Sequence, residues 1–201
     1  MSEKKPPFKL NAEHVALDFV NTLDDRFAPE GTRELLPSYA ELLRFCRQAA
    51  VLTHAEAARL NAAPAAAQNA ALREAIELRE MLARVCYGLL EGRPPTAEDR
   101  ENLQQWALRC VRHRELRWRG GRLAWEWRPS PGQVERPVLL LAQAAVDLLS
   151  AEEPPPLHAC ASGACRWLFL DTSRNRTRRW CDMKTCGNRE KARRYSATHK
   201  S

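Results

Sequence analysis

CASGACRWLFLDTSRNRTRRWCDMKTC, residues 160–186, contains two cysteine pairs whose spacing is typical of a metal site. Each pair has four residues between its members, and 15 residues separate the pairs, in the pattern Cys160-x4-Cys165-x15-Cys181-x4-Cys186. Each pair can fold into a tight turn that offers two thiolates, and the spacer lets the two turns meet around a tetrahedron. We therefore predict one structural zinc ion held by these four cysteines.

The alternatives to a four-cysteine zinc site are weaker. Four thiolates can also hold an iron–sulfur cluster, and His158 can replace one of the ligands. Four unrelated buried cysteines are disfavoured, because this segment is too polar and too short to form a core without a staple. Zinc therefore remains the preferred interpretation.

Around the cysteines the sequence predicts a small zinc-binding module. Residues 166–170 are typical of a strand, residues 171–176 of a turn, and residues 187–197 of a helix. A turn with two ligands, a hairpin and a helix with the last ligand would give a treble-clef-like module. We place its boundary at Glu152-Glu153-Pro154-Pro155-Pro156, because a triple proline cannot continue a helix. The expected domains are residues 1–153 and 154–201.

The excess positive charge lies in the second of these domains. Residues 157–201 hold 11 Lys and Arg against 3 Asp and Glu, whereas the first 156 residues hold 21 against 22. Four thiolates and one Zn²⁺ together carry a charge of −2, so the module stays strongly basic with zinc bound. Many like charges in a small module repel one another, and a polyanionic partner explains why they are tolerated.

Double-stranded DNA is the partner that this charge pattern favours. Arginine and lysine suit phosphates, and arginine and asparagine suit base edges. RNA is the first alternative, because Trp167 and Trp180 could stack on unpaired bases. A zinc-stapled module for protein interaction or redox sensing is the second. The candidate nucleic-acid-binding residues are Arg174, Arg176, Arg178, Arg179, Lys184, Asn188, Arg189, Lys191, Arg193 and Arg194.

Most of residues 1–153 has the periodicity of amphipathic helices. Apolar residues recur at helical spacing within residues 35–50, 72–90, 103–110 and 134–149, and Thr96 with Asp99 resembles a capping box. Residues 15–23 fit either a strand or a short helix. The expected fold is therefore mainly α, a helical N-terminal domain followed by the zinc module, with one small β-hairpin.

That hairpin is predicted near residues 115–128. Gly120-Gly121 is a two-residue turn signal, and with this turn Trp118 faces Leu123 and Leu116 faces Trp125. The apolar residues then share one face and most of the charged ones the other, which a slip of one residue would destroy. We expect the helices to cover the apolar face.

A small-molecule effector is the least specific of the predictions. Arg79 interrupts the apolar stripe of its helix and could hold a carboxylate or phosphate, although its head could also pair with a nearby glutamate. His14, Asn21 and Thr22, beside Asp18, form a polar cluster that could bind a ligand or merely cap the chain. These four, His14, Asn21, Thr22 and Arg79, are the candidate ligand-binding residues.

The sequence does not favour an enzyme or a membrane protein. It has no glycine-rich phosphate loop, G-x-S-x-G or His-Glu-x-x-His motif, and no catalytic residues are assigned. Cys46, Cys86 and Cys110 lie on apolar helical stripes, so we expect them to be buried. No apolar run reaches about 18 residues, and residues 1–7 do not begin a secretory signal. We therefore expect a cytoplasmic protein. We also expect a homodimer, because one small finger makes a small footprint on DNA.

Residues 158–195, and above all Cys186-Gly187-Asn188-Arg189, resemble the CGNR zinc-finger proteins. The N-terminal region, with Asp18-Phe19-Val20-Asn21-Thr22, the Leu78-Arg79 helix and a later hairpin and helix, resembles the ABATE domain that accompanies this finger in bacteria. The resemblance implies a bacterial transcription regulator, some of whose relatives are described as stress-induced. It also implies that the four cysteines bind zinc and that the N-terminal domain senses a ligand.

Overall fold

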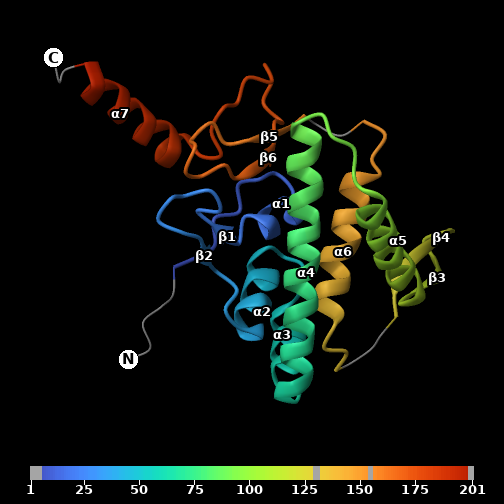
Figure 1. Ribbon diagram of the computed structural model, residues 1–201. Coiled ribbons are helices and arrows are strands. Elements are labelled where there is room, and N and C mark those ends of the chain that lie inside the picture. The colour runs from blue at the N-terminus through green and yellow to red at the C-terminus, as the bar shows by residue number, and fades with distance from the viewer. Residues whose placement is uncertain (1–5, 129–131, 154–155, 199–201) are drawn as a thin grey trace.

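The computed structural model describes residues 6–128, 132–153 and 156–198, without the side chains of Arg194, Ala197 and Thr198. Within these residues the chain is mainly α-helical with three two-stranded antiparallel sheets (Figure 1), which confirms the predicted fold class. The helices are α1 Val15–Val20, α2 Tyr39–Gln48, α3 His54–Asn61, α4 Ala65–Leu90, α5 Ala97–Arg112, α6 Arg136–Leu149 and α7 Asn188–Thr198. The paired strands are β1 Leu23–Asp24 with β2 Arg33–Glu34, β3 Arg114–Arg119 with β4 Arg122–Trp127, and β5 Leu157–Ala159 with β6 Leu168–Leu170.

Polar side chains fix where several helices begin. The Thr96 hydroxyl accepts a hydrogen bond from the Asp99 backbone at the start of α5, as predicted. Thr53 and Glu56 form a reciprocal capping box at the start of α3, a helix that was not predicted from the sequence. The ambiguous segment after His14 is the short helix α1 rather than a strand.

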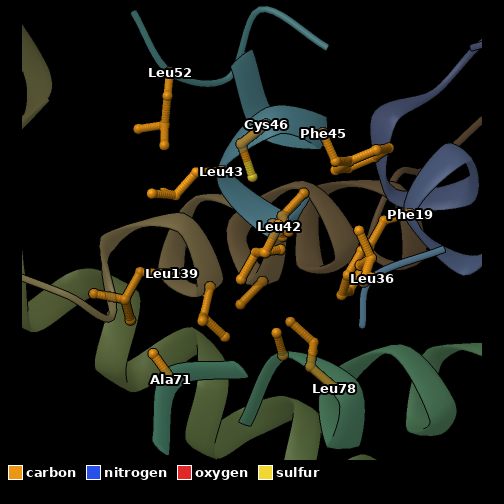
Figure 2. Close-up of a cluster of buried hydrophobic side chains, with 14 of the residues drawn as sticks. Phe19, Leu36, Leu42, Leu43, Phe45, Cys46, Leu52, Ala71, Leu78 and Leu139 are labelled. Carbon is orange, nitrogen blue, oxygen red and sulfur yellow. The ribbon is translucent and has the colours of Figure 1, made fainter. Parts of the chain in front are cut away.

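The larger hydrophobic core lies between α1, α2, α4 and α6. Figure 2 shows Phe19, Leu42, Phe45, Leu78 and Leu139 pointing toward one another from these four helices. Each of these five side chains is buried. Residues of each apolar stripe read from the sequence pack in this core, whereas Leu82 and Cys86 of the stripe within residues 72–90 pack in a second one and Leu89 is 44% exposed.

A second core joins the helical part to the zinc module. Leu17 and Val20 of α1 and Leu82 of α4 pack in the same buried cluster as Leu168 and Phe169 of β6. Figure 1 shows β5 and β6 lying against α1 and the end of α4. Pro154 and Pro155 lie outside the described residues, so the domain boundary stays a prediction. The zinc module nevertheless shares its core with the helices and is not merely tethered to them.

The β3–β4 hairpin has the predicted register, but the helices do not cover its apolar face as predicted. Trp118 pairs with Leu123 and Leu116 with Trp125, across the Gly120-Gly121 turn. The expectation that helices cover the apolar face is wrong, since Trp118 is 69% exposed. Only Trp127, at the base of the hairpin, packs against the core. Alternation within a hairpin fixes which residues share a face, but not how far the neighbouring helices reach over it.

None of the described helices is both long and apolar enough to cross a membrane.

Candidate metal centre and nucleic-acid interface

The four cysteines of the two pairs meet at one point. Cys160 and Cys165 lie in the turn between β5 and β6, and Cys181 and Cys186 lie before and within a π-helical turn, Met183–Gly187, that leads into α7. Their sulfur atoms all lie within 4.8 Å of one another, and all four residues are buried. The Sγ–Sγ distance is 3.6 Å between Cys165 and Cys181 and 3.7 Å between Cys181 and Cys186.

These distances fit a tetrahedral zinc ion. A Zn–S bond of about 2.3 Å places two ligands of a regular tetrahedron about 3.8 Å apart. The cysteines are free thiols rather than disulfides, so all four sulfurs can serve as ligands. The cofactor of this chain is one structural zinc ion, which confirms the prediction. With four protein ligands the ion has no open position, and when bound it acts as a staple of the fold.

Local backbone contacts shape the turns that carry the ligands. The carbonyl of Ser162 accepts hydrogen bonds from the backbone N–H groups of Cys165 and Arg166. Arg166 has a φ of 53°, in the left-handed region that turns the chain toward β6. At the second pair, a Cβ on Gly187 would clash with the Met183 side chain, so glycine allows the close approach there.

One arginine faces the metal centre directly. The Arg189 guanidinium donates a hydrogen bond to Cys186 Sγ at 3.4 Å. Four thiolates around Zn²⁺ carry a net charge of −2, and this cation partly offsets it. The structure therefore places Arg189, a candidate nucleic-acid-binding residue, beside the sulfur cluster.

Side chains of the helical part hold the zinc module in place. Asn21 makes two hydrogen bonds to the backbone of Leu168, each 2.9 Å long, one to its carbonyl and one from its N–H. The Trp167 indole N–H donates to Asp24 at 2.9 Å, and the Tyr87 hydroxyl donates to the Arg166 carbonyl at 2.9 Å. Asn21 thus joins two parts of the chain that are 147 residues apart.

The candidate ligand-binding residues all have partners within the protein. The His14 side chain caps α1, and Thr22 donates a hydrogen bond from its hydroxyl to the Phe19 carbonyl. Asn21 is engaged with the backbone of Leu168. The ligand-binding role of these residues stays a prediction.

Arg79 is the largest of the fully buried side chains. Only 2% of it is exposed, and it makes two hydrogen bonds to Glu34, of 2.8 and 2.6 Å, and one of 2.9 Å to Glu80. Burial by itself would lower the pKa of Arg79, but its hydrogen bonds to Glu34 and the charges of Glu34 and Glu80 raise the pKa above its usual value. The pairing with glutamate that the sequence left open is therefore present, with partners from β2 as well as from α4.

Hydrogen bonds of Asp171 and Arg178 hold the turn between β6 and Cys181 in shape. The buried carboxylate of Asp171 accepts hydrogen bonds from the backbone and hydroxyl of Ser173 and from the backbone of Arg178. The Arg178 guanidinium donates to the carbonyls of Asn11, Trp180 and Cys181, and it lies 4.4 Å above the Phe169 ring. Arg178 thus has several partners within the protein while its side chain stays 22% exposed, and its role at the candidate interface stays a prediction.

The remaining candidate residues of the nucleic-acid interface face outward. Exposed side chains follow the turn and α7, and the side chain of Arg194 lies outside the described residues. Of the exposed residues, Arg193 is 3.6 Å from Glu190, and Asn188 donates to the Lys184 carbonyl. The exposed candidates besides Arg189 are Arg174, Arg176, Arg179, Lys184, Asn188, Lys191 and Arg193.

Many arginines of the helical part are paired with carboxylates, whereas most of the described cations of the zinc module are not. Ten arginines of the helical part form ion pairs with carboxylates: Arg26, Arg33, Arg44, Arg79, Arg84, Arg93, Arg109, Arg117, Arg119 and Arg136. Among the described residues, Arg174, Arg176, Arg179, Lys184 and Lys191 have no carboxylate partner. Other described arginines of the helical part, such as Arg59 and Arg73, also have no ion pair, but residues 1–156 hold 21 Lys and Arg against 22 Asp and Glu, so the net positive charge lies on the zinc module.

One of the two tryptophans differs from the expectation behind the RNA alternative. Trp167 is only 7% exposed and its indole N–H is bonded to Asp24, so it cannot stack on an unpaired base. Its position before β6 places it in the shared core, which the local sequence does not reveal. Trp180 is half-buried.

The three remaining cysteines are buried in the helical part. Burial raises the pKa of the Cys86 thiol to about 12 and that of Cys110 to about 11, and it also raises the pKa of Cys46. Thiols of this kind are poor nucleophiles at neutral pH. Their burial agrees with the sequence prediction.

A cavity of about 450 Å³ lies where the helical part meets the zinc module. Its wall includes Phe8 from the N-terminal segment, Arg33 from β2, Arg44 from α2, and Cys186 and Arg189 beside the metal centre. The sequence does not indicate this cavity, because its walls come from segments far apart in the chain. A molecule bound there would contact both parts of the protein.

Two family comparisons agree with this architecture. Residues 13–152 match the ABATE family, which is described as a "putative stress-induced transcription regulator", and residues 157–199 match the CGNR zinc finger. Both matches confirm the resemblance drawn from the sequence. Among curated proteins no match is found. Neither family description names an enzyme.

Proposed function

Because the chain belongs to the ABATE family of transcription regulators and carries a CGNR zinc finger, we propose that it regulates transcription by binding double-stranded DNA. The observation that carries the proposal is the set of exposed cations without carboxylate partners on the zinc module. Zinc holds the turn after β6 and the start of α7 in a fixed relation, so these cations form a preorganised surface. Phosphates provide the affinity of such a surface, and base edges read by Arg or Asn provide its specificity.

The proposal is tested by selecting bound fragments from random duplex DNA with the zinc-loaded full-length protein at near-physiological salt. An enriched motif supports a sequence-specific regulator. Salt-sensitive binding without a motif would leave only affinity for polyanions. Competition by structured RNA at equal salt distinguishes the RNA alternative, which is favoured if RNA displaces the duplex.

Variants of single cations locate the interface. Arg176→Gln and Lys191→Gln should each lower the slope of log K against log salt by about 1 if the residue contacts a phosphate. A residue that reads a base should instead cost about 1–3 kcal/mol for the preferred sequence only. Arg59→Gln is the matched control, because Arg59 is exposed on α3, away from the zinc module. Equal losses in all three variants would argue against the proposed surface.

We also propose that an effector, if it regulates this protein, binds in the cavity between the helical part and the zinc module. The cavity has the size of a small-ligand site, and its lining includes Arg33, Arg44 and Arg189. A screen of small carboxylates and phosphates by thermal unfolding tests this proposal. A stabilising compound should lose its effect in Arg44→Gln and keep it in Arg59→Gln.

A further inference from the structure

The apolar face of the β3–β4 hairpin is an exposed surface that neither the metal centre nor the DNA interface uses. Leu116, Trp118, Leu123 and Trp125 lie on this face as two cross-strand pairs. Their exposed fractions are 52%, 69%, 60% and 49%. We call these four residues the hairpin face.

The hairpin face begins at the core and runs out into solvent. At its base, Trp127 packs against the core, and the Arg114 guanidinium lies 5.6 Å from the Trp125 ring and 6.0 Å from the Trp127 ring. A two-stranded hairpin is marginally stable in water unless its apolar side is covered. The inner end has such a cover in this chain, and the outer end does not.

The opposite side of the hairpin carries charged side chains that suit exposure to water. Arg119 pairs with Glu126 at 2.7 Å, and Arg117 pairs with Glu115 at 2.6 Å. Two ion pairs thus form within the hairpin and Arg122 is left over, so this side carries only a small net positive charge and does not favour a strongly charged partner. The hairpin face, which is uncharged, favours an apolar partner.

A second copy of the same face meets that requirement. In the described part of the chain, no other helix or strand pair carries more than two exposed large apolar side chains. Two tryptophans and two leucines at these exposures present on the order of 500 Å² of apolar surface, near the upper end for a monomer. That is more than half of the roughly 800 Å² per partner that a specific interface buries, and the flanking strand edges can supply the remainder.

We propose that a second copy of this chain docks on the hairpin face, so that the protein is an isologous homodimer with Trp118 and Trp125 at the centre of the interface. Tryptophans buried at the centre of an interface contribute most to its affinity. Figure 1 shows the hairpin and α7 at opposite ends of the molecule. Dimerisation through the hairpin therefore leaves both α7 helices free. The dimer does not depend on DNA binding, and it provides two half-site readers if DNA binding holds.

Sedimentation of the zinc-loaded protein without DNA, over a hundredfold range of micromolar concentrations, tests the proposal. The wild type should be dimeric, and the double variant Trp118→Gln/Leu123→Gln should be monomeric, with a dissociation constant raised at least a hundredfold. The matched control is Arg117→Gln/Arg119→Gln, which changes two residues on the opposite side of the same hairpin and should remain dimeric. A monomeric wild type, a dimeric Trp118→Gln/Leu123→Gln variant, or a monomeric control would each overturn the proposal.

Hydrogen exchange on the wild-type chain gives a readout that needs no variant. Amides of β3 and β4 should become more protected as the protein concentration rises, whereas those of α3 should not change. Concentration-independent exchange of β3 and β4 would also overturn the proposal. Because DNA is absent from both measurements, failure here leaves the proposed function untouched.

Discussion

The β5–β6 and β3–β4 hairpins are built alike but held in opposite ways. Each is a two-stranded antiparallel sheet, with strands of three residues in β5–β6 and six in β3–β4. In the shorter hairpin Leu168 and Phe169 are completely buried, and the cysteines of its turn bind zinc. In the longer one Trp118 and Leu123 are mostly exposed.

The contrast shows that strand length is not what stabilises a small sheet. Three residues per strand suffice where a metal ion and a shared core hold them in place. Six residues per strand, with a good turn and matched side chains, still leave an apolar face that needs a partner. The shorter hairpin should therefore be much more sensitive to substitution.

Loss of zinc should have the largest effect. Cys160→Ser/Cys165→Ser removes two ligands from the turn of β5–β6, and zinc contributes about 10–16 kcal/mol to the folding of isolated fingers. Because Leu168 and Phe169 also belong to the core of α1 and α4, we expect the melting temperature of the whole chain to fall by more than about 10 °C. Metal analysis and circular dichroism measure both effects, with Cys86→Ala as the zinc-retaining control. Full zinc content in the double serine variant would contradict the assignment of the ligands.

Truncation of the buried aromatic ring should come next. Phe169→Ala leaves a cavity where the ring packs under Arg178, and a change of this kind costs about 3–5 kcal/mol of unfolding free energy. Urea unfolding followed by circular dichroism measures it. A loss below about 1 kcal/mol would mean that β6 is not part of the shared core.

The Asn21 contact tests whether the two parts of the chain unfold together. Asn21→Ala leaves the buried N–H and carbonyl of Leu168 without their side-chain partner, which should cost about 2–3 kcal/mol. Asn61→Ala, at the exposed end of α3, is the control and should have little effect. Two separate unfolding transitions in the wild type would show that the zinc module is independent of the helices.

The smallest effect is expected for the exposed aromatic ring. Trp118→Ala should change the unfolding free energy of the monomer by less than about 0.5 kcal/mol, because the ring is mostly in water. The measurement is urea unfolding at the lowest practical protein concentration, where a dimer dissociates. A loss comparable to that of Phe169→Ala would show that the hairpin face is covered within one chain.

Features encoded by neighbouring residues were predictable from the sequence. The spacing of Cys160, Cys165, Cys181 and Cys186 identified the metal centre, since each pair of ligands needs only a local turn. The register of β3–β4 followed from Gly120-Gly121 and the alternation around it. The helix α3 was missed because His54–Asn61 is short and alanine-rich, so its apolar stripe has only Ala57 and Leu60 on the buried side.

Features that depend on distant residues were not predictable in the same way. Arg79 pairs with Glu34, which lies 45 residues earlier in the chain. The sequence around Arg79 does not indicate that partner. Trp167 and Arg178 looked like nucleic-acid contacts because they lie in a basic segment, yet both are engaged with residues of the N-terminal part. Composition gives the charge of a surface, whereas packing decides which of its side chains are free.

The Asn21–Leu168 contact also has a consequence for synthesis of the chain. A ribosome adds about 5–20 residues per second, so Leu168 follows Asn21 after about 7–30 s. During that interval the apolar side of α1 has no β6 to pack against, and a chaperone or a protease can reach it. A product that stops before the zinc ligands thus lacks both its metal staple and part of its helical core. Such a fragment should be removed rather than accumulate as a stable helical domain that competes with complete copies.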